Sequence, residues 1–524
     1  MLAADESSAV NVAAEILRPG DDAAVALRLR SETERLDVSR GELRQRVRQL
    51  AAALGRLGIQ QEQRVLVVLP DCPEYVYAFL GAIWAGAVPV LVSSFLRPAD
   101  YLPFVRETRA RAVITSEGVA EVLEPEMRLG RLAPAVLTVG PGRSGSLWRE
   151  IEGEPASREP FAAHPDDPAF WLYSSGTTGR PKAVVHVQRS ILHAVESYGR
   201  HVLGVRADDV AYATSKLFFA YGLGASLYFP LAAGAAVVLS PEPFAPARTW
   251  EILSEERPSL FFAVPAVYRA LLDHAPPHAG EAVARLRRAV SAGEALPEAI
   301  FLAWKERFGQ EIIDGLGSTE ALHVFLSNRP GDCIPGTLGR PVPGYEVQVV
   351  DERGAPVATG EVGQLRVRGG SIAAGYWQRA EATRRAFRGE WLVTGDQAIE
   401  QTDGTFCLLG RTDDMLKVSG QWVSPPEVEG VVAAVAGVRE CAVIGCAGES
   451  GLMELVACVV SLPGEEEAVG LRIERACAEG LPRFKRPKRV AFLASLPRTP
   501  SGKVQRFVLR DLARMGTRVR SIGS

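Results

Sequence analysis

The sequence predicts an α/β protein with a large N-terminal domain of doubly wound sheets, a β-rich subdomain, and a small mobile α/β C-terminal domain. Three observations predict this fold class. Short Val/Ile/Leu runs alternate with helical stretches over the first part of the chain. Strand-like segments joined by glycine-containing turns follow from about residue 337, and a shorter α/β pattern follows residues 410–417. The 524 residues, 47% of them hydrophobic and 23% charged, are enough to bury large cores.

The apolar runs have the composition of buried parallel strands. They are RVLVVLP at 64–70, RAVITS at 111–116, AVLTVG at 135–140, AAVVLS at 235–240 and LFFAV at 260–264. Between several of them lie stretches with apolar residues three and four positions apart, such as residues 40–58. Strands and helices that alternate in this way indicate parallel sheets with helices on both faces.

The predicted domain boundaries follow these changes of pattern. We expect an N-terminal domain over residues 1–412, in which about 337–412 form the β-rich subdomain, and a C-terminal domain over residues 413–524. Segments such as EVQVVDERG at 346–354 have the turns and alternation of a small β-sheet. No low-complexity linker separates the two domains, so we expect Asp413 to be a hinge between packed bodies.

Composition and charge exclude several classes of function. A formal net charge of −3 provides no field that would attract nucleic acid or acidic membranes. The seven cysteines include no C-x-x-C pair, which argues against a zinc site and against a disulfide framework. Oligomeric state is left open by these features.

The chain is predicted to be cytoplasmic. Its N-terminus has no basic segment leading into an apolar core, so no secretory signal is expected. Two uncharged runs, residues 75–92 and 217–240, are interrupted by Gly and Pro and end in β-rich segments. A buried helix followed by a buried strand explains both runs better than a membrane span of about 20 residues.

The segment YSSGTTGRPK at 173–182 carries the clearest chemical signal. It follows the apolar strand AFWLYS and combines hydroxyl side chains with Gly176, Gly179 and a closing Lys182. Glycines let backbone N–H groups approach a ligand closely, and the lysine adds a positive charge, so the loop suits a polyphosphate. The Walker spacing G-x-x-x-x-G-K-[ST] is absent, and an isolated loop of this kind can equally be a surface turn.

Four further segments accompany this loop, and their order and spacing are specific. DGLGSTEALHVFLSN places Thr319 and Glu320 after a glycine-rich turn, and WLVTGD ends a strand on Asp396. In isolation, Glu320 would be a helix-start acid and Asp396 a turn cap. The four segments are SAGEALP (291–297), DGLGSTEALHVFLSN (314–328), WLVTGD (391–396) and PRTPSGKVQR (497–506).

With these five motifs in register, the chain resembles, over essentially its full length, the adenylate-forming superfamily of acyl- and aryl-CoA ligases, peptide-synthetase adenylation domains and luciferases. The resemblance implies binding of ATP, Mg²⁺ and coenzyme A. By this resemblance, Glu320 would hold the magnesium ion, Thr319 would contact the α-phosphate, and Lys503 would be the adenylation lysine. The phosphate loop would comprise Ser174, Ser175, Thr177, Thr178 and Lys182. The adenine and ribose residues would be Gly293, Glu294, Ala295, Asp314, Gly315, Leu316, Asp396 and Arg411.

The same resemblance implies a second half-reaction and a substrate class. The segment 415–429 is similar to the family segment that lines the pantetheine tunnel, with Gly420 against the arm and Lys417 nearby. The basic cluster FKRPKR at 484–489 could meet the CoA phosphates or be a solvated surface. The segment SKLFFAYGLGAS at 215–226 has no acid for an amino-acid ammonium and resembles the benzoate-CoA ligase branch. The aryl pocket would be lined by Ala220, Tyr221, Gly317, His323 and Val324.

We therefore expect an ATP-dependent aryl-CoA ligase. Its substrate would be an aromatic carboxylic acid, either benzoate or a ring-substituted benzoate such as 2-aminobenzoate or hydroxybenzoate. A hydrophobic pocket discriminates weakly against small added groups, so the sequence does not choose among these acids. The first alternative is an aryl adenylation enzyme that loads the pantetheine thiol of an acyl carrier protein. The second is a non-catalytic nucleotide sensor, against which the joint presence of Lys182, Glu320, Asp396 and Lys503 argues.

Overall fold

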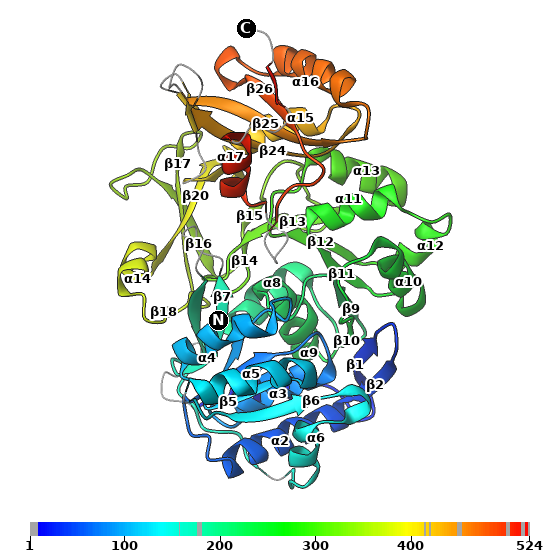
Figure 1. Ribbon diagram of the computed structural model, residues 1–524, viewed down its shortest axis with the longest axis vertical. Helices are drawn as coiled ribbons and strands as arrows, with labels where there is room; N and C mark the ends of the chain where they lie inside the picture. Colours follow the sequence, from blue (N-terminus) through cyan, green and yellow to red (C-terminus); the bar gives the residue numbers. More distant parts are fainter. Residues whose placement is uncertain are drawn as a thin grey trace.

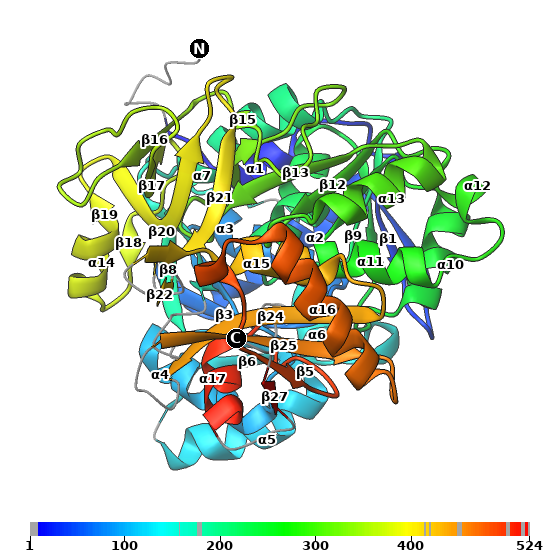
Figure 2. The same ribbon diagram turned by 90° about the horizontal axis from the view of Figure 1, so that it is seen from above.

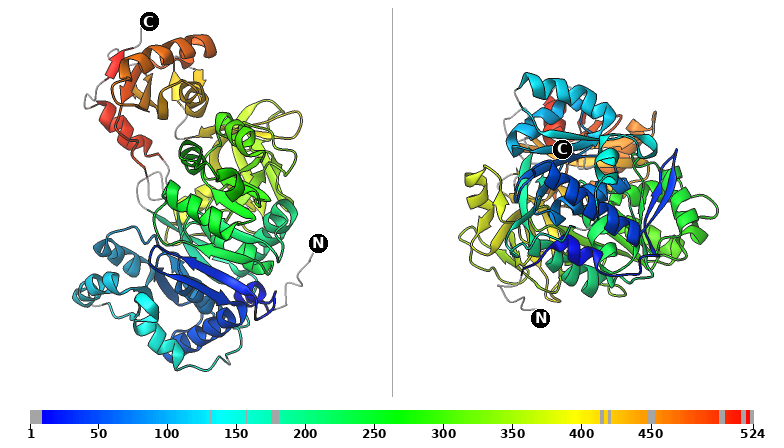
Figure 3. Two further views of the ribbon diagram at one scale, coloured as in Figure 1. Left: turned by 90° about the vertical axis from the view of Figure 1, so that its right-hand side faces the viewer. Right: turned by 90° about the horizontal axis from the view of Figure 1, so that it is seen from below.

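The computed structural model describes residues 9–521 except 131, 157, 175–180, 413–415, 419–420, 448–452, 499–503 and 515–518. The fold class is as predicted: a large N-terminal α/β domain with a β-rich part and a separate small C-terminal α/β domain (Figure 1). The C-terminal unit lies at one end of the long axis of the molecule. The first 200 residues lie toward the other end (Figure 3).

Two large, mainly parallel sheets form the N-terminal domain. The seven-stranded sheet has the order β18-β8-β7-β4-β3-β5-β6, and the nine-stranded sheet has the order β15-β14-β13-β12-β11-β9-β10-β1-β2. The strands of the first are β3 (Arg64–Val68), β4 (Val88–Leu91), β5 (Ala112–Ser116), β6 (Ala135–Val139), β7 (Pro168–Ser174), β8 (Lys182–Val187) and β18 (Gly375–Tyr376). Those of the second are β1 (Val25–Arg30), β2 (Arg35–Ser39), β9 (Val210–Ala213), β10 (Ala236–Leu239), β11 (Leu260–Ala263), β12 (Arg288–Ala292), β13 (Ile312–Gly317), β14 (Val324–Ser327) and β15 (Arg340–Pro341).

Helices cover these sheets, and among the described residues three buried apolar clusters join helices to strands, the largest of them shared by both sheets. Helix α2 (Arg40–Arg56) realises the helix predicted over 40–58, and it begins where the Ser39 hydroxyl accepts from the Glu42 N–H at 3.1 Å. The other helices of the two sheets are α1 (Val12–Leu17), α3 (Pro73–Trp84), α4 (Leu102–Thr108), α5 (Glu117–Leu129), α6 (Ser146–Glu152), α7 (Gln188–Ala194), α8 (Ala220–Leu223), α9 (Phe229–Ala232), α10 (Pro246–Glu256), α11 (Pro265–Asp273), α12 (Ala279–Val283) and α13 (Glu298–Phe308).

The two uncharged runs are buried helix-strand units, as predicted. Every residue of α3 is buried, and β4 follows it. In the second run, α8 continues through a π-helical turn, η4 (Gly224–Tyr228), into α9 and then β10. Among the described residues, no helix is long and apolar enough to cross a membrane.

The β-rich subdomain is a five-stranded antiparallel sheet with one short helix. It lies on the opposite side of the molecule from α11 and α13 when seen from above (Figure 2). Its elements are β16 (Tyr345–Val350), β17 (Val362–Gly369), α14 (Ala380–Ala386), β19 (Phe387–Arg388), β20 (Trp391–Glu400) and β21 (Phe406–Arg411).

In the described residues, the C-terminal unit contains a two-stranded sheet, a four-stranded sheet, three α-helices and a short 3₁₀ helix, η5 (Arg483–Lys485). Its own buried apolar clusters are separate from the N-terminal core. Its elements are β22 (Leu416–Val418), β23 (Gln421–Val423), α15 (Pro425–Ala433), β24 (Val438–Ala447), β25 (Met453–Ser461), α16 (Glu466–Gly480), β26 (Arg489–Phe492), α17 (Arg506–Arg514) and β27 (Val519–Ser521).

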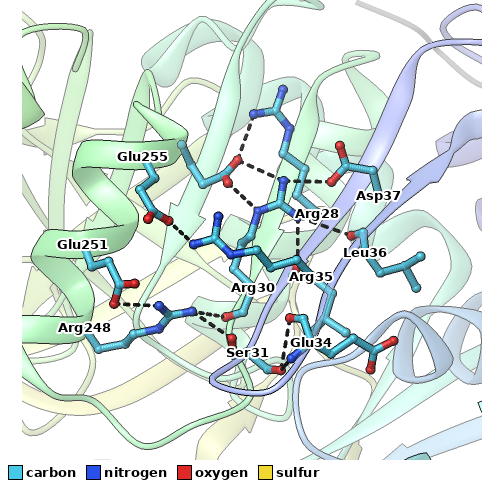
Figure 4. A network of polar contacts seen from close by, with 12 residues as sticks. Arg28, Arg30, Ser31, Glu34, Arg35, Leu36, Asp37, Arg248, Glu251 and Glu255 are labelled. Atoms are coloured by element: carbon cyan, nitrogen blue, oxygen red, sulfur yellow. Dashed lines mark hydrogen bonds and ion pairs between the residues drawn. The ribbon is translucent and has the colours of Figure 1, made fainter. Parts of the chain in front are cut away.

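The N-terminal hairpin β1–β2 is tied to helix α10 by ion pairs (Figure 4). Glu256, whose side chain is 7% exposed, accepts from Arg28 at 3.0 Å and also pairs with Arg30. Its neighbour Glu255 pairs with Arg35 at the surface, where the two side chains are 40% and 53% exposed. The hairpin completes the edge of the nine-stranded sheet, so this network fastens the first strands of the chain to a helix more than 200 residues away.

Candidate active site

Lys182 and Glu320 contact the same tyrosine. Lys182 is the first residue of β8, which pairs with β7 and, on its other side, with β18. Tyr376, in β18, donates its hydroxyl to Glu320 Oε1 at 2.9 Å, and the Lys182 Nζ atom lies 5.0 Å from the centroid of its ring. Burial raises the pKa of the Tyr376 phenol, so it remains the donor in this contact. A lysine and a carboxylate that are 138 positions apart in the sequence therefore both contact Tyr376.

The turn that carries Thr319 and Glu320 is fixed by its backbone. His186 in β8 lies with its Nε2 atom 2.8 Å from the Thr319 carbonyl oxygen, and the Glu320 carbonyl accepts from the Ala373 N–H at 2.9 Å. Burial lowers the pKa of His186 to about 4, so the ring is neutral and Nε2 carries the proton that it donates. The imidazole is stacked on Phe170, with ring centroids 5.0 Å apart. The turn is therefore held from two directions.

The glycine-rich segment before this turn was predicted to be a turn itself, and that prediction was wrong. Residues Ile312–Gly317 form strand β13, between β12 and β14. A Cβ on Gly315 would lie 2.7 Å from Val324 Cγ1 and 2.8 Å from the Leu326 oxygen. The glycines therefore permit close pairing with β14, and the turn begins only after Gly317.

Asp314 links two of the predicted adenine segments. It is buried in β13, opposite Ser291 of β12, and its Oδ2 atom accepts from the Leu296 N–H at 3.2 Å. This bond holds the loop that contains Gly293, Glu294 and Ala295, in which Gly293 has a φ of +97°. Burial raises the pKa of Asp314 to about 7. Gly315 and Leu316 follow Asp314 in the same strand, so these predicted residues lie on β13 and on the loop that follows the adjacent strand β12.

The position of Asp396 differs from the prediction. It does not end a strand but lies inside β20, where the pairing with β21 is irregular after Gln397. Gly395, with a φ of +76°, lies in a second irregularity of β20, where the pairing with β17 shifts between Val393 and Gln397. Asp396 is 7% exposed, and its Oδ1 atom lies 3.2 Å from Arg411 Nη1; Arg411 also donates to the Thr394 carbonyl at 2.8 Å. The two predicted ribose residues are thus neighbours across β20 and β21.

His323 is at the centre of a cluster of aromatic rings. It is 3% exposed, and its Nε2 atom lies 3.3 Å from the Tyr221 carbonyl oxygen. Burial lowers the pKa of His323 to about 3, so the imidazole is neutral. If Nε2 donates to Tyr221, Nδ1 is a hydrogen-bond acceptor, and this buried atom has no partner among the described residues. The rings within 6.3 Å of its centroid belong to Tyr198, Tyr221, Tyr228 and Phe229.

Two glycines leave room for this histidine. A Cβ on Gly224 would lie 2.5 Å from His323 Cδ2 and 2.8 Å from the Tyr228 hydroxyl. A Cβ on Gly317 would lie 2.5 Å from the His323 carbonyl oxygen. Ala220 and Tyr221 begin helix α8, and the Tyr221 hydroxyl donates to the Val290 carbonyl at 3.0 Å. The predicted pocket residues come from α8, the end of β13, the turn after β13 and the start of β14; they are Ala220, Tyr221, Gly317, His323 and Val324.

The remaining predicted residues belong to the phosphate loop, the hinge and the C-terminal unit. Ser174 ends β7 and Lys417 belongs to β22, whereas six others lie outside the described residues. They are Ser175, Thr177, Thr178, Asp413, Gly420 and Lys503. In the cluster at 484–489, Lys485 binds Glu427 at 2.6 Å and Arg486 donates to the Leu481 carbonyl at 2.8 Å, so two of its cations have partners within the C-terminal unit.

Sequence reasoning missed three residues that the geometry singles out. They are His186, Tyr376 and Gly224. Gly224 lies inside the segment already assigned to the aryl pocket, so that segment contained a usable signal. His186 and Tyr376 have no comparable signal, because their contacts join segments distant in the sequence.

The fold, the collected motifs and the comparison with known proteins define the class of protein: the chain belongs to the AMP-binding enzyme family, which residues 15–377 match. Residues 427–503 match the AMP-binding enzyme C-terminal domain. A benzoate–CoA ligase of Thauera aromatica is 42% identical over 90% of this chain and 90% of its own length.

Two other proteins are similar over most of the chain. A 4-hydroxybenzoate–CoA/benzoate–CoA ligase of Rhodopseudomonas palustris is 40% identical, over 91% of this chain and 89% of its own. The solved structure of the anthranilate CoA ligase AuaEII in complex with anthranoyl-AMP has a TM-score of 0.90 and 36% identity, covering 97% of this chain and 98% of its own.

Proposed function

We propose that this protein is an ATP-dependent aryl-CoA ligase that forms an aroyl adenylate and then an aroyl-CoA thioester. The observation that carries the proposal is the short turn between β13 and β14. Its backbone brings Glu320 to Tyr376, whose ring also contacts Lys182, while His323, three residues later, is enclosed by aromatic rings. A charged phosphate side and an apolar aryl side on one turn are what joining a benzoate to a nucleotide requires.

The first half-reaction joins two anions. A carboxylate oxygen of the substrate attacks the α-phosphorus of ATP, a new O–P bond forms, and the bond from that phosphorus to pyrophosphate breaks. Lys182 would neutralise the β- and γ-phosphates, Thr319 would contact the α-phosphate, and Lys503 would offset charge as the bond forms. Asp396 would accept from the ribose hydroxyls.

The residues present also fit a magnesium ion. Mg²⁺ is usually bound by one or two carboxylates together with substrate phosphates, and Glu320 is a carboxylate beside the proposed phosphate site. The described residues include no cluster of three or more His, Cys, Asp or Glu that could hold a metal without the nucleotide. Bound there, the ion would polarise the phosphoryl oxygens.

In the second half-reaction the CoA thiol attacks the acyl carbon. A C–S bond forms, the C–O bond to AMP breaks, and the thiol proton is released to solvent. The segment that contains Lys417 and Gly420 would line the pantetheine tunnel, with Asp413 as the hinge that presents it.

The polarity of the pocket favours a ring with a hydrogen-bond donor. The unpaired Nδ1 atom of His323 is a buried acceptor, and such an atom costs about 1–3 kcal/mol unless a partner satisfies it. An amino or hydroxyl group on the benzoate ring can provide that partner. An aminobenzoate or hydroxybenzoate is therefore the preferred substrate over benzoate itself.

A product assay tests the proposal. Purified protein is incubated with ATP and Mg²⁺ and a panel of benzoate, amino- and hydroxybenzoates, cinnamates and fatty acids, with and without CoA, and products are identified by mass spectrometry. We expect aroyl-CoA and AMP from benzoates, with kcat/KM about tenfold higher for a donor-substituted ring. An adenylate with no CoA ester would indicate loading of a carrier protein, and no turnover of any acid would overturn the proposal.

A further inference from the structure

Tyr376 occupies a fixed position at the edge of the seven-stranded sheet. Its strand β18 pairs with β8 so that Tyr376 lies opposite Val184. Its N–H donates to Thr383 Oγ1 at 3.1 Å, and its ring packs edge-on against Phe387 with centroids 5.4 Å apart. Because backbone and ring are both held, the hydroxyl is directed at one place.

That place lies between two groups of opposite charge. The hydroxyl donates to Glu320, and Lys182 lies over the ring face. In the part of the chain that the structure describes, Lys182 and Glu320 form no ion pair with each other and instead each contact Tyr376. Without the tyrosine, a flexible ammonium and a carboxylate so placed would attract each other directly. Such a pair would neutralise the cation meant for phosphate and the carboxylate meant for metal.

We propose that Tyr376 is a positioning residue that holds Glu320 through its hydroxyl and keeps Lys182 apart from it with its ring. This inference rests on the proposed function, in which Lys182 contacts phosphate and Glu320 holds Mg²⁺. The two parts of the side chain have separate tasks: the hydroxyl orients the metal carboxylate, and the ring keeps the lysine free for the nucleotide.

Two substitutions separate these tasks. Tyr376→Phe removes the hydroxyl and keeps the ring, whereas Tyr376→Leu removes both. Tyr101→Phe is the matched control, because its hydroxyl donates to two main-chain carbonyls, those of Ser93 and Leu96, at 3.0 and 3.1 Å. Binding of ATP to each full-length protein is measured by isothermal titration calorimetry, once with EDTA and once with Mg²⁺, so that no turnover is needed.

We expect Tyr376→Phe to bind ATP in EDTA within about twofold of the unsubstituted protein but to lose about tenfold of the affinity that Mg²⁺ adds, a typical effect of removing a partner of a metal ligand. Tyr376→Leu should also bind ATP in EDTA several-fold more weakly, since Lys182 can then pair with Glu320. The inference is overturned if Tyr376→Phe weakens binding equally with and without Mg²⁺, or if neither variant differs from Tyr101→Phe. Absence of ATP binding by the unsubstituted protein would instead refute the proposed function.

Discussion

Gly224 shows how little space surrounds the imidazole of His323. Its Cα approaches both that ring and the Tyr228 hydroxyl so closely that an added methyl group would lie 2.5 Å and 2.8 Å from them. Neither ring can retreat easily, because His323 and Tyr228 are both buried among other aromatic side chains. The size of residue 224 therefore sets the position of His323.

We predict that Gly224→Ala impairs use of the aromatic acid more than use of ATP. The methyl group must displace His323, and one methylene in an apolar pocket changes discrimination by about 10–200-fold. The KM for the best benzoate should rise at least about tenfold, measured by pyrophosphate release, with the KM for ATP nearly unchanged. The control is Gly118→Ala in α5, where a Cβ would meet nothing within 4 Å. An unchanged benzoate KM in Gly224→Ala would contradict this account of the pocket.

At the scale of elements, local sequence pattern was enough to predict several strands and helices but not the contacts between them. The run at 64–70 became β3 because Val and Leu favour a buried strand, and Ser39 capped α2 where the amphipathic pattern began. The same reasoning wrongly predicted a turn at residues 314–317. Glycine usually indicates a turn, but here it lies in a strand because a neighbouring strand packs too closely to allow a Cβ atom.

Contacts between distant elements could not be predicted from the sequence. The bond from Tyr376 to Glu320 spans 56 positions and depends on β18 joining the edge of a sheet formed by much earlier strands. The placement of Asp396 inside β20 depends on the register with β21, which a single strand does not encode. The motif positions in the sequence were therefore informative, while the residues that position them emerged only from the tertiary structure.

The hairpin β1–β2 provides a prediction at this scale. Glu256→Gln should lower the free energy of unfolding by about 3 kcal/mol, because Arg28 loses its carboxylate and Arg30 keeps only the more exposed Asp37. The neighbouring Glu255→Gln removes an exposed pair and should cost less than about 1 kcal/mol. Urea unfolding of both variants checks this difference. Equal losses would show that burial of Glu256 does not determine the strength of the network.

Over the whole molecule, buried titratable groups act on stability in opposite directions. His186 and His323 have pKa values lowered by burial to about 4 and about 3, so the unfolded chain binds their protons first as the pH falls below about 6.5. Asp71 and Asp314 have pKa values raised by burial to about 6 and about 7, so the folded chain binds their protons first. The histidines favour unfolding on acidification, and the aspartates favour the folded state.

Between pH 5 and 6 these contributions to the pH dependence of stability nearly cancel. The unfolded chain has bound about two protons on the histidines, and the folded chain has bound about two on the aspartates.

Replacing one histidine should remove this cancellation and make the stability depend on pH. In His323→Asn the folded state gains stability relative to the unsubstituted protein by about 1.4 kcal/mol for each pH unit of acidification across this window. Urea unfolding at pH 5, 5.5 and 6 measures how the free energy of unfolding changes with pH in each protein. The two pH dependences are compared, because the stability lost through the smaller side chain is the same at every pH. Parallel profiles for His323→Asn and the unsubstituted protein would mean that His323 is not held neutral by burial, and the assignment of its Nδ1 atom as a free acceptor for the substrate ring would lose its basis.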